Sequence, residues 1–179
     1  MSKKVLILSA SPRKGGNSDL LCDQFLLGAK ETGHAAEKIF LRDKKINHCL
    51  ACGACQGNGG RCVQKDDMVE VLDKMIAADV IVMATPVYFY SMNGQMKTLI
   101  DRTYARYTNI SNKEMYFIMA AAVNSKNALE RTLEGFRGFT SCLPGAKENG
   151  VIYGTGAWKA GDIKGSNAMT EAYEMGKKG

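Results

Sequence analysis

Several residue types and patterns are scarce in this sequence of 179 residues, and each shortage excludes a class of function. Only two histidines are present, His34 and His48, and no Ser–His–Asp set or pair of carboxylates suggests an acid–base catalytic site. No apolar run approaches the length that crosses a bilayer. No basic block interleaved with aromatic residues suggests a nucleic-acid interface. We therefore expect neither a membrane nor a nucleic acid as partner.

The residues that are present suit an ordinary α/β domain spanning residues 1–179. Apolar residues make up 45% of the chain and charged residues 23%, and the length suffices for a single sizeable core. Met1–Lys4 leads directly into a strand without a signal-peptide pattern, which predicts a cytoplasmic location. The net charge of +6 is spread along the chain and is best interpreted as solvated surface, although it weakly favours anionic ligands such as phosphorylated nucleotides.

Short apolar strands alternate with amphipathic helices along the chain. Strands are predicted at Val5–Leu8, Ala36–Leu41, Asp79–Ala84, Met115–Val123 and Val151–Tyr153. Helices are predicted from Asn17–Ser18 to near Gly33, from Asp67, from Ser91 or Asn93, from about Asn127 to Phe139, and up to near Gly176. This alternation predicts a parallel, doubly wound sheet with helices on both faces. Ligands of such sheets bind beyond the carboxyl ends of the strands.

The first strand runs into a turn rich in hydroxyl groups and glycine, residues 9–18. Gly15 and Gly16 allow backbone to approach a ligand closely, and the free N–H groups of the following helix attract an anion. Arg13 offers a fork of donors to a phosphate. The spacing matches neither a Walker A loop nor a Gly-x-Gly-x-x-Gly turn. The turn therefore predicts a site for a monophosphate that is held and not transferred; the plain alternative is an ordinary strand–loop–helix corner.

A second unusual segment, residues 85–94, follows the third predicted strand. It places three aromatic residues, Tyr88, Phe89 and Tyr90, where loops are normally polar. Aromatic residues often plug the end of a sheet, so simple packing is one interpretation. The other is a wall for a flat ring system whose polar edge meets backbone groups. Its place at the carboxyl edge, beside the first loop, favours the second interpretation.

Six cysteines in a chain expected in the cytoplasm indicate metal or redox chemistry more than structural disulfides. Four of them lie close together in an irregular, glycine-rich insertion at about residues 47–65, namely Cys49, Cys52, Cys55 and Cys62. Four thiolates could ligate an iron–sulfur cluster or a structural zinc ion. Alternatively, the loop could be empty, oxidised or packed at a subunit contact. Cys22 and Cys142 are more typical of small buried residues.

Together, residues 11–18 and 85–88, with Gly94–Lys97 and Asp101–Arg102, resemble the NADPH-dependent FMN reductases, which are flavodoxin-like proteins. The resemblance extends to the tail, residues 161–176, and implies a five-stranded parallel sheet in the order 2-1-3-4-5. It also implies bound FMN. By this likeness the phosphate is held by Ser9, Ser11, Arg13, Asn17 and Ser18. The isoalloxazine ring is lined by Pro86, Val87, Tyr88 and Phe89.

The cysteine spacing is similar to that of the iron–sulfur flavoproteins, a branch of the same family. That likeness implies a [4Fe–4S] cluster on Cys49, Cys52, Cys55 and Cys62, although many flavodoxin-like relatives keep similar cysteines without a cluster.

The resemblance implies an FMN-dependent oxidoreductase that passes electrons from NAD(P)H to a small-molecule or protein acceptor. The flavin carries the chemistry, so no side chain need act as an acid or base. The family is often homodimeric with the flavin near the interface, which predicts a homo-oligomer, dimer or tetramer. One alternative is a flavodoxin-like electron carrier without a substrate of its own. Another is a metal-stabilised module whose cysteine loop binds a protein.

Overall fold

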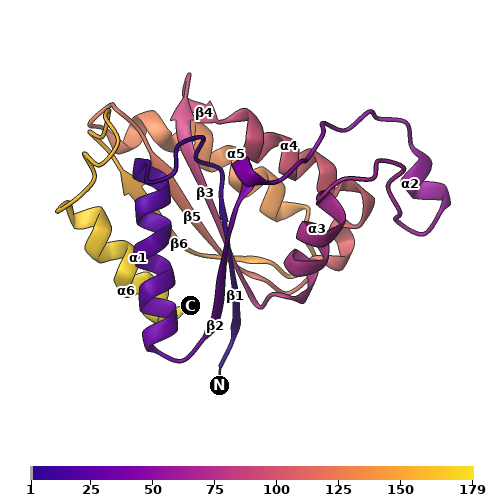
Figure 1. Cartoon of the computed structure of the whole chain (residues 1–179), viewed down its shortest axis with the longest axis horizontal. Helices are drawn as coiled ribbons and strands as arrows, with labels where there is room; N and C mark the ends of the chain where they lie inside the picture. The colour runs from indigo at the N-terminus through magenta and orange to yellow at the C-terminus, as the bar shows by residue number, and fades with distance from the viewer. Residues whose placement is uncertain (1) are drawn as a thin grey trace.

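A computed structural model, which describes residues 2–179, places a twisted parallel sheet between two layers of helices (Figure 1). Within these residues five strands pair in parallel in the order β2-β1-β3-β5-β6. Their bounds are Lys4–Ser9 (β1), Ala35–Phe40 (β2), Val80–Tyr88 (β3), Glu114–Ala120 (β5) and Lys147–Gly154 (β6). The predicted doubly wound class and the order of the parallel strands are confirmed. A sixth strand was not predicted: β4 (Ser91–Met92) pairs antiparallel with the end of β3.

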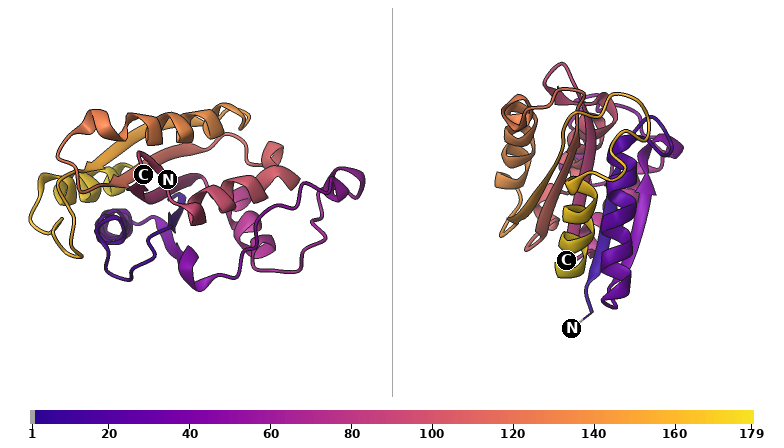
Figure 2. Two further views of the ribbon diagram at one scale, coloured as in Figure 1. Left: turned by 90° about the horizontal axis from the view of Figure 1, so that it is seen from above. Right: turned by 90° about the vertical axis from the view of Figure 1, so that its left-hand side faces the viewer.

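The helices divide between the two faces of the sheet, as the two views in Figure 2 show. One face carries α1 (Asn17–Glu31) and α6 (Asn167–Lys178). The other carries α3 (Met68–Ala77), α4 (Gly94–Arg102) and α5 (Glu130–Ser141). The short α2 (Ala54–Gly57) lies apart, in a loop that projects from the side of the molecule opposite α6 (Figure 1). Within residues 2–179, the structure has no helix with the length and apolar character of a membrane span.

Each face of the sheet has its own hydrophobic core, and this explains the apolar runs of the central strands. Along β1, Val5 and Ile7 face α1, while Leu6 and Leu8 face the α3 side. One core contains the stacked rings of Phe117 and Phe136, with centroids 4.9 Å apart.

The last helix is fixed to the first by two glycines. A Cβ atom on Gly28 of α1 would collide with the carbonyl oxygen of Tyr173, and one on Gly176 of α6 would collide with that of Phe25. The two helices therefore meet backbone to backbone, which only residues without a side chain permit. This contact fixes where the loop that precedes α6 returns to the sheet.

Some predicted boundaries are wrong by a few residues. The strand predicted to reach Val123 ends at Ala120, where the chain leaves the sheet as a loop. The last strand begins at Lys147, four residues before the predicted Val151. Its first residues are exposed and polar, so they carry no apolar signal. Helix α5 begins at Glu130, after a 3-10 turn over Lys126–Leu129.

Candidate functional site

The two loops singled out in the sequence line one cavity of about 220 Å³ at the carboxyl ends of the strands. The first loop contributes residues from Ser11 to Ser18, and the end of β3 contributes Pro86–Tyr88. Residues 120–122 after β5 and residues 157–160 after β6 complete the lining. Segments far apart in the sequence thus meet at the edge where ligands of doubly wound sheets bind.

One end of this cavity is suited to an anion. Helix α1 begins after Gly16 without a capping side chain. Within residues 2–179, the backbone N–H groups of Asn17, Ser18 and Asp19 have no hydrogen-bond acceptor. Arg13 is exposed beside them and forms no ion pair with another described residue. Unpaired N–H groups, the helix dipole and a guanidinium are the features that favour binding of a phosphate.

Asn17 has a second role that the sequence did not reveal. Its amide nitrogen donates to the carbonyl oxygens of Ala157 at 3.1 Å and Lys159 at 2.9 Å. Its side-chain oxygen accepts from the N–H groups of Gly161 at 3.0 Å and Ile163 at 3.3 Å. The side chain therefore anchors the loop after β6, and only the backbone N–H of Asn17 remains for a phosphate.

The predicted phosphate-binding hydroxyls differ in their positions. Ser18 lines the cavity, as does Ser11, whose hydroxyl braces the loop by donating to the carbonyl oxygen of Arg13 at 2.7 Å. Ser9 does not line the cavity. It is buried in β1 and donates to the Asp19 carboxylate at 2.9 Å. Its contact with the loop is therefore indirect.

Asp19 itself was missed by sequence reasoning. An acidic residue in the first turn of a helix is normally interpreted only as a partner of the helix dipole. Here the carboxylate is buried and also accepts from the Gly15 N–H at 2.9 Å and from Lys38 Nζ at 2.8 Å. No local pattern signals that Lys38, on β2, reaches it.

The other end of the cavity is bounded by Pro86, Val87 and Tyr88, with Trp158 from the loop after β6. Phe89 is not among the lining residues. It lies fully exposed in the turn between β3 and β4, where Phe89 and Tyr90 both have positive φ, at 50° and 62°. A two-residue hairpin turn of this kind requires positive φ at both positions, which turns the Phe89 side chain outward.

Asn93 connects this wall to the first loop. It caps α4 by accepting from the Met96 N–H at 3.1 Å, and it donates to the Ala10 carbonyl at 2.6 Å. Its own N–H donates to Thr85 Oγ1 at 3.0 Å. All of these groups are buried, so β1, β3 and α4 are held in one arrangement around the cavity.

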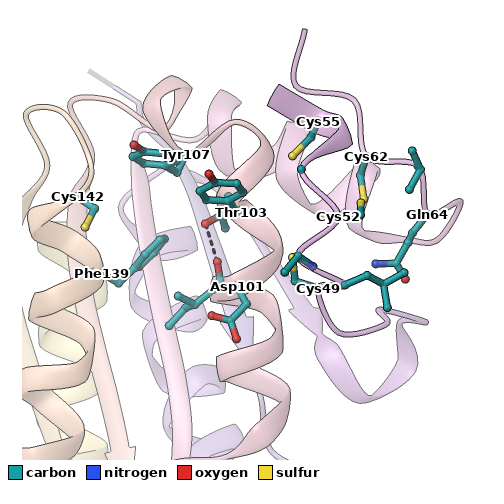
Figure 3. A pocket seen from close by; sticks show the side chains of 16 residues that line it. Cys49, Cys52, Cys55, Cys62, Gln64, Asp101, Thr103, Tyr107, Phe139 and Cys142 are labelled. Carbon is teal, nitrogen blue, oxygen red and sulfur yellow. Dashed lines mark hydrogen bonds between the residues drawn. The ribbon is translucent and has the colours of Figure 1, made fainter. Parts of the chain in front are cut away.

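The cysteine loop lines a second, larger cavity of about 740 Å³ (Figure 3). Cys49, Cys52, Cys55 and Cys62 all border it and are free thiols. Within residues 2–179, no three Cys, His, Asp or Glu side chains are grouped so that they could hold a metal ion. The thiols therefore share a cavity without surrounding a common point.

The two remaining cysteines differ from each other. Cys22 is buried, as predicted, and burial raises the pKa of its thiol. Cys142 was also predicted to be buried, and this is wrong. It lies exposed at the end of α5, across the second cavity from the loop cysteines (Figure 3).

Arg102, the last residue of α4, joins both ends of the cysteine loop. It pairs with Asp66 at 2.6 and 3.0 Å, and the two side chains are 2% and 0% exposed. The same guanidinium donates to the Asn47 carbonyl at 2.6 Å and to Cys62 Sγ at 3.6 Å. Helix α4 thus begins at contacts with the first cavity and ends at the cysteine loop.

The environment of Asp66 keeps it ionised. Burial by itself would raise the pKa of this carboxyl group. Hydrogen bonds from Arg102 and from the N–H groups of Asn47 and Met68 outweigh burial and hold the pKa below its ordinary value of 3.8.

Comparison with known proteins agrees with this geometry. The sequence model of the family described as NADPH-dependent FMN reductase matches residues 3–146. The chain belongs to the NADPH-dependent FMN reductase family. An iron-sulfur flavoprotein of Methanocaldococcus jannaschii is 34% identical over 183 residues, covering 98% of this chain and 94% of that protein. An iron-sulfur flavoprotein of Archaeoglobus fulgidus is 40% identical over 99 residues, 55% of this chain but only 44% of that relative.

Solved structures show the same fold. The FMN-dependent NADH-azoreductase of Bacillus anthracis, solved in complex with FMN, aligns with a TM-score of 0.75 over 98% of both chains at 20% identity. The Trp repressor binding protein of Bacillus subtilis aligns with a TM-score of 0.72 at 23% identity, over 96% of this chain and 99% of that one. At these identities the likeness is one of fold alone.

In this member of the FMN reductase family, the residues fit FMN better than they fit an iron–sulfur cluster. The first cavity suits FMN, because uncapped N–H groups and Arg13 lie at one end and Pro86–Tyr88 form a wall at the other. The cysteine loop contains four thiols, which is the type and number of ligands that a [4Fe–4S] cluster needs. Its present conformation does not bring them to one centre.

Proposed function

We propose that this protein is an FMN-dependent oxidoreductase that passes electrons from NAD(P)H to a small-molecule or protein acceptor. The observation that supports this most strongly is the first cavity, which combines an anion site with an aromatic wall. In this proposal residues 1–179 form one FMN-binding domain with a cysteine-rich insertion at about 47–65. The free thiols suit a reducing compartment, and a cytoplasmic location stays a prediction.

The phosphate end would bind through backbone and side-chain donors together. The N–H groups of Asn17 and Ser18, the Ser18 hydroxyl and the Arg13 guanidinium all border the same space. Ser11 and Ser9 would act indirectly, by bracing the loop and its supporting carboxylate. This arrangement gives several charge-assisted hydrogen bonds to a dianion.

The ring end would leave part of the flavin accessible. The cavity volume of about 220 Å³ is below the roughly 300–1,000 Å³ that encloses a drug-sized ligand. A flavin nucleotide would therefore be only partly enclosed, and a nicotinamide could approach an open ring face. When bound, FMN would supply the hydride chemistry. Among the described residues, the lining contains no carboxylate and no histidine, which suits a reaction in which no side chain acts as acid or base.

Two measurements test this proposal. Protein purified gently should contain FMN, seen in its visible spectrum and confirmed by extraction. Steady-state oxidation of NADH and NADPH, with a quinone or ferricyanide as acceptor, should then show turnover with at least one donor. Full flavin occupancy without turnover on either donor would refute the proposed enzymatic activity and favour the role of an electron carrier.

We propose further that Cys49, Cys52, Cys55 and Cys62 ligate a [4Fe–4S] cluster. The four free thiols share one cavity, and the relatives of Methanocaldococcus and Archaeoglobus are named iron-sulfur flavoproteins. Because the thiols do not surround a common point here, the loop would have to tighten around the cluster.

Anaerobic purification with iron and sulfide analysis tests the cluster. Cys55→Ser should lower the iron and sulfide content, since it removes one of four ligands. Cys142→Ser is the matched control and should leave the content unchanged, because Cys142 lies across the cavity from the loop. Iron-free wild-type protein from an anaerobic preparation would reject the cluster.

We also propose that the protein forms a homo-oligomer through the turn between β3 and β4. Tyr88, Phe89 and Tyr90 are exposed there together, and exposed aromatic clusters are typical of protein interfaces. Light scattering after size-exclusion chromatography should give a dimer or tetramer, and Phe89→Ser should shift it toward monomer. A wild-type monomer at all concentrations tested would exclude this interface.

A further inference from the structure

A buried carboxylate lies directly under the proposed phosphate site. Asp19, in the first turn of α1, is 3% exposed and accepts three hydrogen bonds. The donors are Ser9 Oγ at 2.9 Å, the Gly15 N–H at 2.9 Å and Lys38 Nζ at 2.8 Å. The Gly15 bond reaches directly into the loop between β1 and α1, while Ser9 and Lys38 hold the same carboxylate from β1 and β2.

The bond to Gly15 sets the shape of that loop. Gly15 has φ of 70°, a conformation that glycine adopts readily, and its N–H points inward to Asp19. The Gly16 N–H closes the same turn onto the Arg13 carbonyl at 3.0 Å. With these two N–H groups engaged, the N–H groups of Asn17 and Ser18 are the ones left facing the cavity.

This arrangement creates an electrostatic conflict that Lys38 resolves. A carboxylate so close to the proposed site would repel a phosphate dianion. Lys38 reaches Asp19 from β2, with its side chain 19% exposed, and also pairs with Asp23 at 2.5 Å. Burial alone would lower the pKa of Lys38, but the hydrogen bonds to Asp19 and Asp23 keep the pKa above its ordinary value. Lys38 therefore carries its positive charge at neutral pH.

We propose that Asp19 and Lys38 are positioning residues for the FMN phosphate. Asp19 fixes the loop in its phosphate-binding shape, and Lys38, which it shares with Asp23, offsets part of the negative charge that this would otherwise place beneath the phosphate. The inference rests on the proposed FMN site and deepens it. It concerns the phosphate alone, because neither residue lines the cavity wall where the ring would lie.

The comparison of FMN with riboflavin, which lacks the phosphate, tests this role. Apoprotein is titrated with each flavin, and the dissociation constants are compared for wild type, Lys38→Met, Lys38→Arg and the double variant Lys38→Met/Asp19→Asn. Lys74→Met is the surface control, because Lys74 also pairs with a residue of β2, Glu37, but lies away from the loop.

Lys38→Met should weaken FMN binding at least tenfold and change riboflavin binding less than about twofold. The Asp19 carboxylate, then without its cation, repels the phosphate of FMN, and riboflavin has no phosphate. Lys38→Arg keeps the charge and should stay within about threefold of wild type. The double variant should recover most of the FMN affinity, since Asp19→Asn removes the negative charge while the amide oxygen still accepts from the Gly15 N–H. Lys74→Met should match wild type.

Each of the other possible outcomes contradicts one step of the proposal. Equal loss for both flavins in Lys38→Met would mean that Lys38 only supports the fold. A double variant no better than Lys38→Met would mean that Lys38 acts on the phosphate directly and not through Asp19. If Lys38→Met does not fold, Lys38→Gln, which also removes the charge, takes its place in the comparison of FMN with riboflavin. Wild-type protein that binds FMN no more tightly than riboflavin would refute the phosphate site itself, and with it this role.

Discussion

Replacing Arg102 by methionine should destabilise the protein strongly at neutral pH. The substitution keeps most of the side-chain volume but leaves the Asp66 carboxylate, which is fully buried, without its cation. Breaking a buried ion pair in this way costs about 3–5 kcal/mol. For a chain of this size, each kcal/mol lowers Tm by about 2–4 °C, so Tm should fall by about 6–20 °C.

Arg106 provides the matched control. It pairs with Asp73 at 2.5 Å, but the two side chains are 34% and 57% exposed, unlike the buried pair of Arg102 and Asp66. Exposed ion pairs contribute about 0–1 kcal/mol, so Arg106→Met should leave Tm nearly unchanged. Urea unfolding followed by circular dichroism gives the free energy of unfolding for both variants.

The pH dependence of the Arg102→Met effect identifies its cause. In wild type the pKa of Asp66 is held below 3.8, so its contribution to stability is present above that value and is lost as pH falls through the lower folded pKa. In the variant the hydrogen bonds from Arg102 are lost while burial and the two backbone N–H donors remain, so the folded pKa of Asp66 is higher than in wild type. Asp66 therefore takes up its proton at a higher pH in the folded variant than in wild type, and the difference in stability between the two should shrink from pH 7 toward about pH 4.5.

Two results would refute this reasoning. A destabilisation below about 1 kcal/mol at pH 7 would mean that the pair is not buried in solution. A large destabilisation that is the same at about pH 7 and pH 4.5 would assign the loss to packing and not to the uncancelled charge.

Three other substitutions test separate parts of the structure. Arg13→Ala should weaken FMN binding about 10- to 100-fold in calorimetric titrations, because a hydrogen bond to the charged phosphate is lost, and it should leave riboflavin binding unchanged. If the variant binds FMN as tightly as wild type does, the phosphate site is contradicted. Phe89→Asn, measured in urea at a concentration at which the protein is monomeric, should raise the free energy of unfolding by about 0.5–1 kcal/mol, since asparagine tolerates positive φ. A loss of stability in the monomer would mean that the ring contacts another part of its own chain. Gly176→Ala should cost about 1–3 kcal/mol, because its Cβ would collide with α1, and an unchanged Tm would show that the two helices separate easily.

The sequence was sufficient for the parts of the fold that rest on local patterns. The central strands are buried on both faces, so each appears as a continuous apolar run. Residues 11–18 and 86–88 each follow one of these apolar runs. Because the carboxyl ends of parallel strands lie at the same edge of a sheet, this was enough to predict that the two segments lie together. β4 has only two residues and therefore no periodicity to detect.

The contacts that shape the site could not be predicted, because they join residues distant in sequence. Asn17 was predicted to hold the phosphate at the start of a helix, but its side chain binds residues 157–163. Asp19 lies on α1 and Lys38 on β2, and only the packing of this helix beside β2 brings them together. Likewise Arg102 was identified only as part of a motif, since its partners, Asn47 and Asp66, lie in an irregular loop.

The anchoring of residues 157–163 by Asn17 has a consequence for the order in which the molecule is made. A ribosome delivers the chain from its N-terminus, so Asn17 emerges early and its partners emerge just before the final helix. The wall at residues 157–160 cannot close until that late segment is available. Until residues 157–163 are available, the nascent chain would thus carry half of the proposed cofactor site, and tight uptake of FMN would mark the moment at which this segment has joined the sheet.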